Sequence, residues 1–220
     1  MNLAELAYAC RIYEWYSTSD RDYRQFLTNV ANSPDLAIAE HRLHLVRWLK
    51  SWHCFRGVPD YAVTAANEVG AWYDEHMHAL PPPTRDLWEL TDEEIGAVHE
   101  ACRKLAQRQA GRNARSVVRI GWVAAAKTLF GLRPRSLMAW DNTIMQGYSY
   151  DMFIRTAMQD AEALAERHGL EIGAIPQTIG KPDATVPKLL DEYYWMTKVM
   201  NLRIPDSSTL QQWAVWSVIP

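Results

Sequence analysis

The stretch that decides the fold is GWVAAAKTLFGLRPRSLMAWDNTI, residues 121–144. Its first half has the apolar content of a buried helix, and Ala124, Ala125 and Ala126 would allow close packing by neighbouring helices. Gly131 and Pro134 predict that this helix ends and that the chain bends. The stretch therefore predicts two helices joined by a short connection.

Asp141 is the acidic residue of this stretch, directly after the apolar run 137–140. Aspartate is a favoured N-cap, so we expect Asp141 to begin the next helix. Free N–H groups and the helix dipole would then favour its ionised form. The residue type suits either an ordinary cap or a catalytic carboxylate, and the sequence leaves both interpretations open.

Helical periodicity and helix punctuation recur along the rest of the chain, whereas alternation typical of strands is almost absent. The spacing of Thr91 and Glu94 is that of a capping box. The fold class predicted is all-α, a two-lobed helical domain over residues 1–220, with a lobe junction near residues 79–90, where three prolines occur in a row. Helices are expected at about 3–16, 20–32, 34–52, 61–78, 91–109, 113–131, 141–168, 188–202 and 206–218.

Composition excludes several classes of protein. With 48% hydrophobic and 22% charged residues, the chain is in the range of globular proteins. The sequence shows neither a signal peptide nor a long apolar run, which predicts a cytoplasmic protein without a membrane anchor. Its three cysteines suggest buried thiols, and no motif predicts a metal or a cofactor.

Charge is distributed unevenly along the chain. Residues 101–140 contain nine basic side chains and no acidic one, whereas the rest contains 14 Lys and Arg against 26 Asp and Glu. Such asymmetry predicts a surface that binds DNA or another anionic ligand, although pairing with acids elsewhere in the protein would explain it equally well. The candidate anion-binding residues are Arg108, Arg112, Arg115, Arg119, Lys127, Arg133 and Arg135, the first four aligned on one face if their helix is continuous.

Residues 115–145 resemble the catalytic segment of the helix-hairpin-helix DNA glycosylases, which are all-α base-excision enzymes. Val123 and Asp141 are separated by the interval that separates the corresponding valine and catalytic aspartate in some members of that family. The resemblance implies that Asp141 stabilises a sugar cation as a base leaves. It also implies that the family's hairpin lies at residues 118–121, where only Gly121 remains of its glycines.

The same resemblance distinguishes two modes of base excision. Members with lyase activity carry a nucleophilic lysine where this chain has Trp122, so the resemblance implies a monofunctional glycosylase. Trp122 and Trp140 are candidates for stacking on a base, although the apolar flank of Trp140 is also typical of a core. The alternatives are an inert binding or regulatory module of the glycosylase fold, and a small-molecule enzyme acting on an anionic substrate.

Overall fold

The computed structural model describes residues 1–144, 147–206, 208–210 and 212. These residues are mostly helical, as the sequence predicts, with one small β-hairpin. The α-helices are α1 (Leu3–Tyr16), α2 (Ser19–Asn29), α3 (Ala39–Ser51), α4 (Tyr61–His76), α5 (Asp92–Gln107), α6 (Gly121–Leu132), α7 (Tyr150–His168), α8 (Ile175–Thr178) and α9 (Val186–Tyr194). The hairpin consists of β1 (Gln109–Arg112) and β2 (Val117–Arg119).

Local capping explains several helix boundaries. The predicted capping box of α5 is present: the side chain of Thr91 accepts from the backbone N–H of Glu94, and that of Glu94 accepts from the N–H of Thr91. Helix α7 ends at Gly169, whose φ of 62° is left-handed and so favours glycine.

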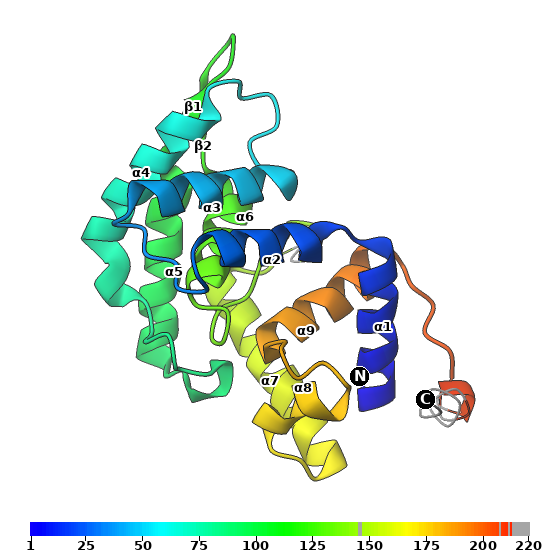
Figure 1. Cartoon of the computed structure of the whole chain (residues 1–220). Helices are drawn as coiled ribbons and strands as arrows, with labels where there is room; N and C mark the ends of the chain where they lie inside the picture. Colours follow the sequence, from blue (N-terminus) through cyan, green and yellow to red (C-terminus); the bar gives the residue numbers. More distant parts are fainter. Residues whose placement is uncertain (145–146, 207, 211, 213–220) are drawn as a thin grey trace.

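The helices form two groups that are not continuous in sequence. Figure 1 shows α2 to α6 and the hairpin on one side of the molecule, and α1 with α7, α8 and α9 on the other. Helix α1 packs against α9, whereas α3 packs against α4. The chain therefore crosses between the groups after α1 and again between α6 and α7.

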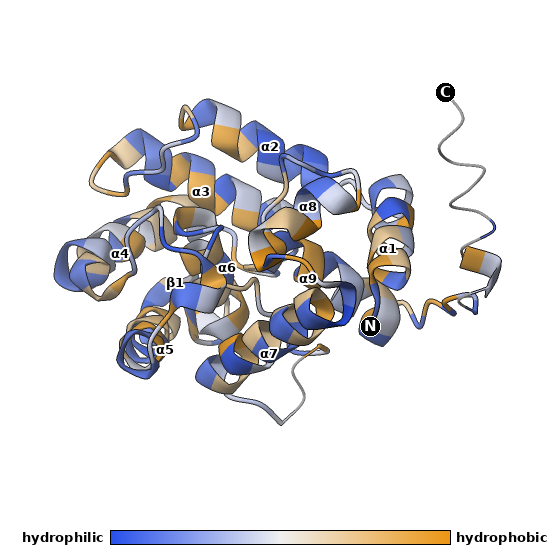
Figure 2. Cartoon of the chain, turned by 90° about the horizontal axis from the view of Figure 1, so that it is seen from below, coloured by the Kyte–Doolittle hydropathy of each residue, from blue (hydrophilic) through white to orange (hydrophobic). Residues whose placement is uncertain are grey.

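Helix α6 is buried along most of its length. Every residue from Ala124 to Leu132 is buried, and the Cα of Gly131 lies so close to Trp48 that an added Cβ would be 2.8 Å from its ring. Trp48 stacks on Phe26 with ring centroids 5.0 Å apart and contacts Trp52 edge-on at 4.8 Å. Figure 2 shows the opposite pattern at the surface, where the outer side of α7 is largely hydrophilic. The small residues of α6 thus admit the large rings of α2 and α3.

The segment 79–90 packs against the chain that follows α6. The buried Arg133 donates from Nε to the carbonyl oxygen of Pro81 at 2.5 Å, and the N–H of Leu87 donates to the carbonyl of Arg135 at 3.0 Å. These contacts fasten the proline-rich segment at both ends. Its role as a lobe junction stays a prediction.

The expected continuous helix through Arg108, Arg112, Arg115 and Arg119 is wrong. Helix α5 ends at Gln107, and the chain forms the antiparallel hairpin before α6 begins at Gly121, where φ is 76°. The side chain of Asn113 accepts hydrogen bonds from the N–H groups of Arg115 and Ser116, both at 2.8 Å, and so fixes the turn. The four arginines do not share a helix face.

Two other helix boundaries differ from the prediction. Helix α3 begins at Ala39 rather than at Pro34, because the side chain of Asp35 accepts from the N–H of Ala37 in a local turn. Helix α7 begins at Tyr150 rather than at Asp141. Much of the predicted helix 206–218 lies outside the described residues. No helix among those that the structure describes is long and apolar enough to span a membrane.

Candidate functional site

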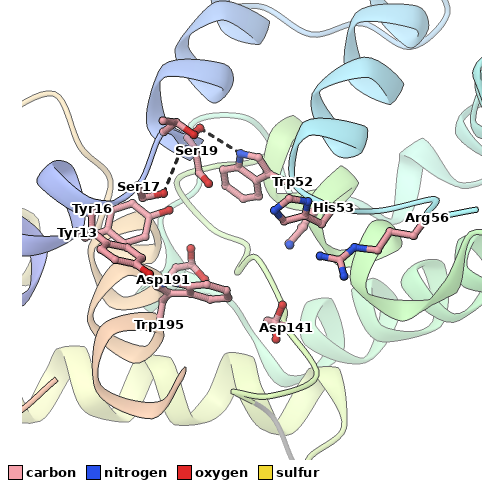
Figure 3. Close-up of a pocket in the computed structure, with 12 residues that line it drawn as sticks. Tyr13, Tyr16, Ser17, Ser19, Trp52, His53, Arg56, Asp141, Asp191 and Trp195 are labelled. Atoms are coloured by element: carbon pink, nitrogen blue, oxygen red, sulfur yellow. Dashed lines mark hydrogen bonds between the residues drawn. The ribbon is translucent and has the colours of Figure 1, made fainter. Parts of the chain in front are cut away.

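A pocket of about 310 Å³ lies where the two helix groups meet (Figure 3). Four separate parts of the chain supply its walls: the end of α1 with the connection to α2, the loop after α3, the middle of α6 with the turn that follows it, and the end of α9. The residues lining it are Tyr13, Tyr16, Ser17, Thr18, Ser19, Trp52, His53, Arg56, Lys127, Asp141, Asp191 and Trp195.

Asp141 lies in a turn and lines this pocket. Its Oδ1 accepts from the N–H of Thr143 at 2.9 Å, and its backbone carbonyl accepts from the N–H of Ile144 at 3.1 Å. The local turn uses the acceptor that an N-cap would offer to a helix, which explains why the expected capping role is wrong. The buried run 137–140 anchors the chain just before it, and the carboxylate is partly exposed.

Lys127 is the predicted basic residue that the structure brings beside Asp141. Although its side chain is a cation, it is only 8% exposed on the buried helix α6. Its Nζ lies over the ring of Trp52, 5.2 Å from the centroid, and it forms no ion pair within 4 Å among the described residues. A buried ammonium group without a bonded carboxylate is available to a ligand in the pocket.

The loop after α3 is held in an unusual conformation at the rim. His53 and Phe55 both have left-handed φ angles, of 63° and 58°. The ammonium group of Lys50 donates to the carbonyl of Phe55 at 2.9 Å, and the indole N–H of Trp52 donates to the carbonyl of Ser19 at 3.1 Å (Figure 3). Left-handed non-glycine residues carry a conformational cost and are concentrated at binding sites. The loop is thus braced from two sides in the conformation that forms the wall.

Asp191 is a site residue that sequence reasoning missed. It is 8% exposed, and Figure 3 shows it in the pocket wall beside Trp195, across the cavity from Asp141. Burial raises the pKa of Asp191 to about 7, with Lys188 and Lys127 opposing the change. The pocket therefore holds two carboxyl groups in different surroundings.

A helix that is buried on nearly every side explains why Asp191 was missed. Lys188, Asp191 and Glu192 are charged residues among the apolar ones of α9, and each is no more than 8% exposed. In sequence, these charges are typical of a solvated face. Only the packing of α9 against α1 and α7 reveals that they face inward.

The predicted stacking residues Trp122 and Trp140 do not line the pocket. Trp140 is 8% exposed and stacks on Tyr150 with ring centroids 5.8 Å apart. Trp122 lies between Trp140 and His99, with its ring centroid 5.6 and 5.5 Å from theirs. The aromatic side chains that the structure places at the pocket are instead Tyr13, Tyr16, Trp52 and Trp195.

Three of the predicted anion-binding arginines lie on the hairpin. Arg112, Arg115 and Arg119, called here the hairpin arginines, are all exposed, and none forms an ion pair with another described residue. The hairpin projects from the end of its helix group (Figure 1). Unpaired guanidinium groups on a projecting element suit contacts with phosphate.

The remaining predicted arginines bond within the protein. Arg108 pairs with Glu75 at 2.5 Å and with Glu68 at 3.6 Å. Arg135 forms two bonds to Asp86, at 2.8 and 2.7 Å. Burial lowers the pKa of Arg133, whose guanidinium donates to backbone carbonyls. The basic segment thus divides into a structural part and an exposed part on the hairpin.

The hairpin and the pocket share the loop after α3. His53 and Arg56 line the pocket, and Val58 in the same loop contacts Gly111 of β1 so closely that an added Cβ would be 2.5 Å from Val58 Cγ1. Stacking of Phe55 on Tyr61, with centroids 5.7 Å apart, ties the loop to the start of α4. One braced loop therefore supports both predicted parts of the site.

Comparison with family models, with curated proteins and with solved structures found no significant match, so the functional argument depends on the residues of the site.

Proposed function

We propose that the protein is a monofunctional base-excision enzyme that removes a base from DNA by hydrolysis of the N-glycosidic bond, with Asp141 as its catalytic carboxylate. The likeness of residues 115–145 to helix-hairpin-helix glycosylases supports this proposal. Its membership of that family is part of the proposal.

The observation that carries the proposal is the position of Asp141. It lines a pocket whose walls include the rings of Tyr13, Trp52 and Trp195, and it makes no ion pair with any described residue. An unpaired carboxylate beside aromatic walls suits a flipped nucleotide, because the rings stack on the base and the anion stabilises positive charge on the sugar. A volume of about 310 Å³ is at the lower end of the range for small-molecule sites, roughly 300–1,000 Å³.

The surface around the pocket fits a polyanion. Arg56 and His53 lie at its rim, and the hairpin arginines extend the basic surface through the same loop. Contacts with phosphate hold a nucleic acid in register without reading its sequence. In this proposal the hairpin grips the backbone while the pocket receives one nucleotide.

Two exposed aromatic side chains stand beside the opening. Trp15 is 86% and Tyr16 is 63% exposed at the end of α1, and Tyr16 also lines the pocket. Exposed aromatic rings next to a nucleic-acid site can stack on unpaired bases. We assign them the role of stabilising the DNA from which the nucleotide has been flipped.

A panel of duplex oligonucleotides tests the proposal, each with one damaged or mispaired base and each scored for abasic sites by alkaline cleavage. The wild type should release at least one base, and Asp141→Asn should lower that rate by roughly two to three orders of magnitude while retaining DNA affinity. The matched control is Asp74→Asn, because Asp74 is exposed on α4 away from the pocket.

The alternatives give different results in the same panel. DNA binding without release of any base would favour the inert binding module. If the wild type neither binds DNA nor releases a base, the small-molecule alternative would be preferred. Robust release by Asp141→Asn would show that the aspartate has been assigned wrongly.

A further inference from the structure

Asp191 is a buried carboxyl group whose hydrogen-bonding capacity is directed at the pocket. Its neighbours on α9 are paired elsewhere: Lys188 bonds to Asp20 and to Glu192, both at 2.7 Å. Asp191 itself forms no ion pair within 4 Å among the described residues. A buried acid that structural ion pairs leave free is a candidate for chemistry.

The charges around Asp191 come from several elements. Lys188 on α9 and Lys127 on α6 favour its ionised form, whereas Glu192 on α9 and Asp141 in the turn oppose it. Tyr13 on α1 and the pair His53 and Arg56 line the same cavity. Desolvation outweighs the two lysines and raises the pKa of Asp191 to about 7, so a large fraction of the side chains carries a proton at neutral pH.

Asp141 lies in different surroundings within the same cavity. It is partly exposed, and the N–H of Thr143 donates to its carboxylate. Two carboxyl groups with such different environments can act as acid and as anion in one reaction.

We propose that Asp191 is a second catalytic residue of this pocket, the general acid that protonates the departing base while Asp141 stabilises the sugar cation. This inference rests on the proposed function. It narrows the substrate class to neutral bases, whose departure is slow unless a proton is supplied.

The reaction balances with water as the co-reactant. The bond between C1′ and the base nitrogen breaks, and its electron pair moves to the base, which takes the proton of the Asp191 carboxyl group. Water then forms a bond to C1′ and gives a proton to Asp141. The products are the free neutral base and a sugar with a hydroxyl group at C1′, and transfer of a proton from Asp141 to Asp191 through solvent restores both carboxyl groups.

A pair of leaving groups tests the assignment. Single-turnover release is measured for a neutral damaged base that the wild type excises and for 7-methylguanine, whose positive charge lets it leave without a further proton. We expect Asp191→Asn to slow release of the neutral base by roughly 100-fold or more and to change release of 7-methylguanine only a few-fold. Asp141→Asn should slow both.

The pH profile and a conservative variant provide a second measurement. Release of the neutral base by the wild type should decline above about pH 7, as Asp191 loses its proton. This decline should vanish in Asp191→Asn and return in Asp191→Glu, which restores an acid at that position. Circular dichroism confirms that each variant is folded.

The outcomes separate the two proposals. If the wild type is active and Asp141→Asn is not, but Asp191→Asn slows both bases equally or neither, the assignment of Asp191 is wrong and the proposed function survives. If the wild type releases neither base, the proposed function fails, and the role of Asp191 fails with it.

Discussion

Burial of Asp191 has a consequence for stability that does not depend on any activity. Its pKa is raised from the ordinary 3.8 to about 7, because the folded protein disfavours the ionised carboxylate. At about 1.4 kcal/mol for each pH unit, this change corresponds to a stabilisation of up to about 4 kcal/mol. That stabilisation is fully present below about pH 4 and is lost as the pH rises through about 7.

Asp191→Asn keeps the size of the side chain and removes its titration. Relative to the wild type, the variant should therefore gain stability as the pH rises, with a difference that grows by up to about 4 kcal/mol between pH 4 and pH 8. Urea denaturation followed by circular dichroism at each pH measures this difference. Any constant cost of the amide group cancels, because only the change with pH is compared.

The matched control is Asp74→Asn on the exposed side of α4, for which we expect a difference from the wild type that hardly varies with pH. A difference between Asp191→Asn and the wild type that is equally independent of pH would refute the reasoning. So would a variant that loses stability relative to the wild type above pH 7.

Three other predictions address the DNA surface, the chemistry and the core. Replacing the hairpin arginines with alanine should flatten the dependence of log K on log salt by up to about 3, at roughly 0.9 for each phosphate contact. Arg103→Ala, which removes a partner of Glu100, should leave that slope unchanged; an unchanged slope in the hairpin variant would exclude phosphate contacts there. Borohydride should trap no complex with damaged DNA, because Trp122 cannot form a Schiff base; trapping that disappears in Lys127→Ala would contradict the monofunctional assignment. Gly131→Ala should cost about 1–3 kcal/mol of unfolding free energy in urea titration, since its Cβ would lie 2.8 Å from the ring of Trp48, and a cost near zero would show that the ring can move.

The helices that the sequence predicted well are those with local signals. The capping box of Thr91 and Glu94 fixes the start of α5, and Gly169 fixes the end of α7. These signals act within one turn of helix, so they can be read without knowledge of the fold.

The hairpin could not be predicted in the same way. Its strands are only four and three residues long, and arginine is compatible with either helix or strand. Its conformation depends on the side chain of Asn113 in the turn and on the contact between Gly111 and Val58 of a distant loop. Tertiary packing thus overrides a helix that the charge spacing favours.

The candidate site was predicted in part. The sequence singled out Asp141 and Lys127, which the structure places in one pocket, although in a turn and on a buried helix rather than at a helix N-terminus and on a basic surface. It missed Asp191 and Trp52, because their role depends on how α9 and the loop after α3 pack against α6. Side chains brought together by packing leave no spacing in the sequence.

The most direct test of the central claim is the affinity of the pocket for positive charge at the sugar. Two duplexes are compared, one with a pyrrolidine sugar analogue that is protonated at neutral pH and one with an uncharged tetrahydrofuran abasic site. If Asp141 stabilises a sugar cation, the wild type should bind the pyrrolidine duplex roughly 100-fold more tightly than the tetrahydrofuran duplex, and Asp141→Asn should lose most of that preference. Equal affinity of the wild type for the two duplexes, or a preference that persists in Asp141→Asn, would contradict the account.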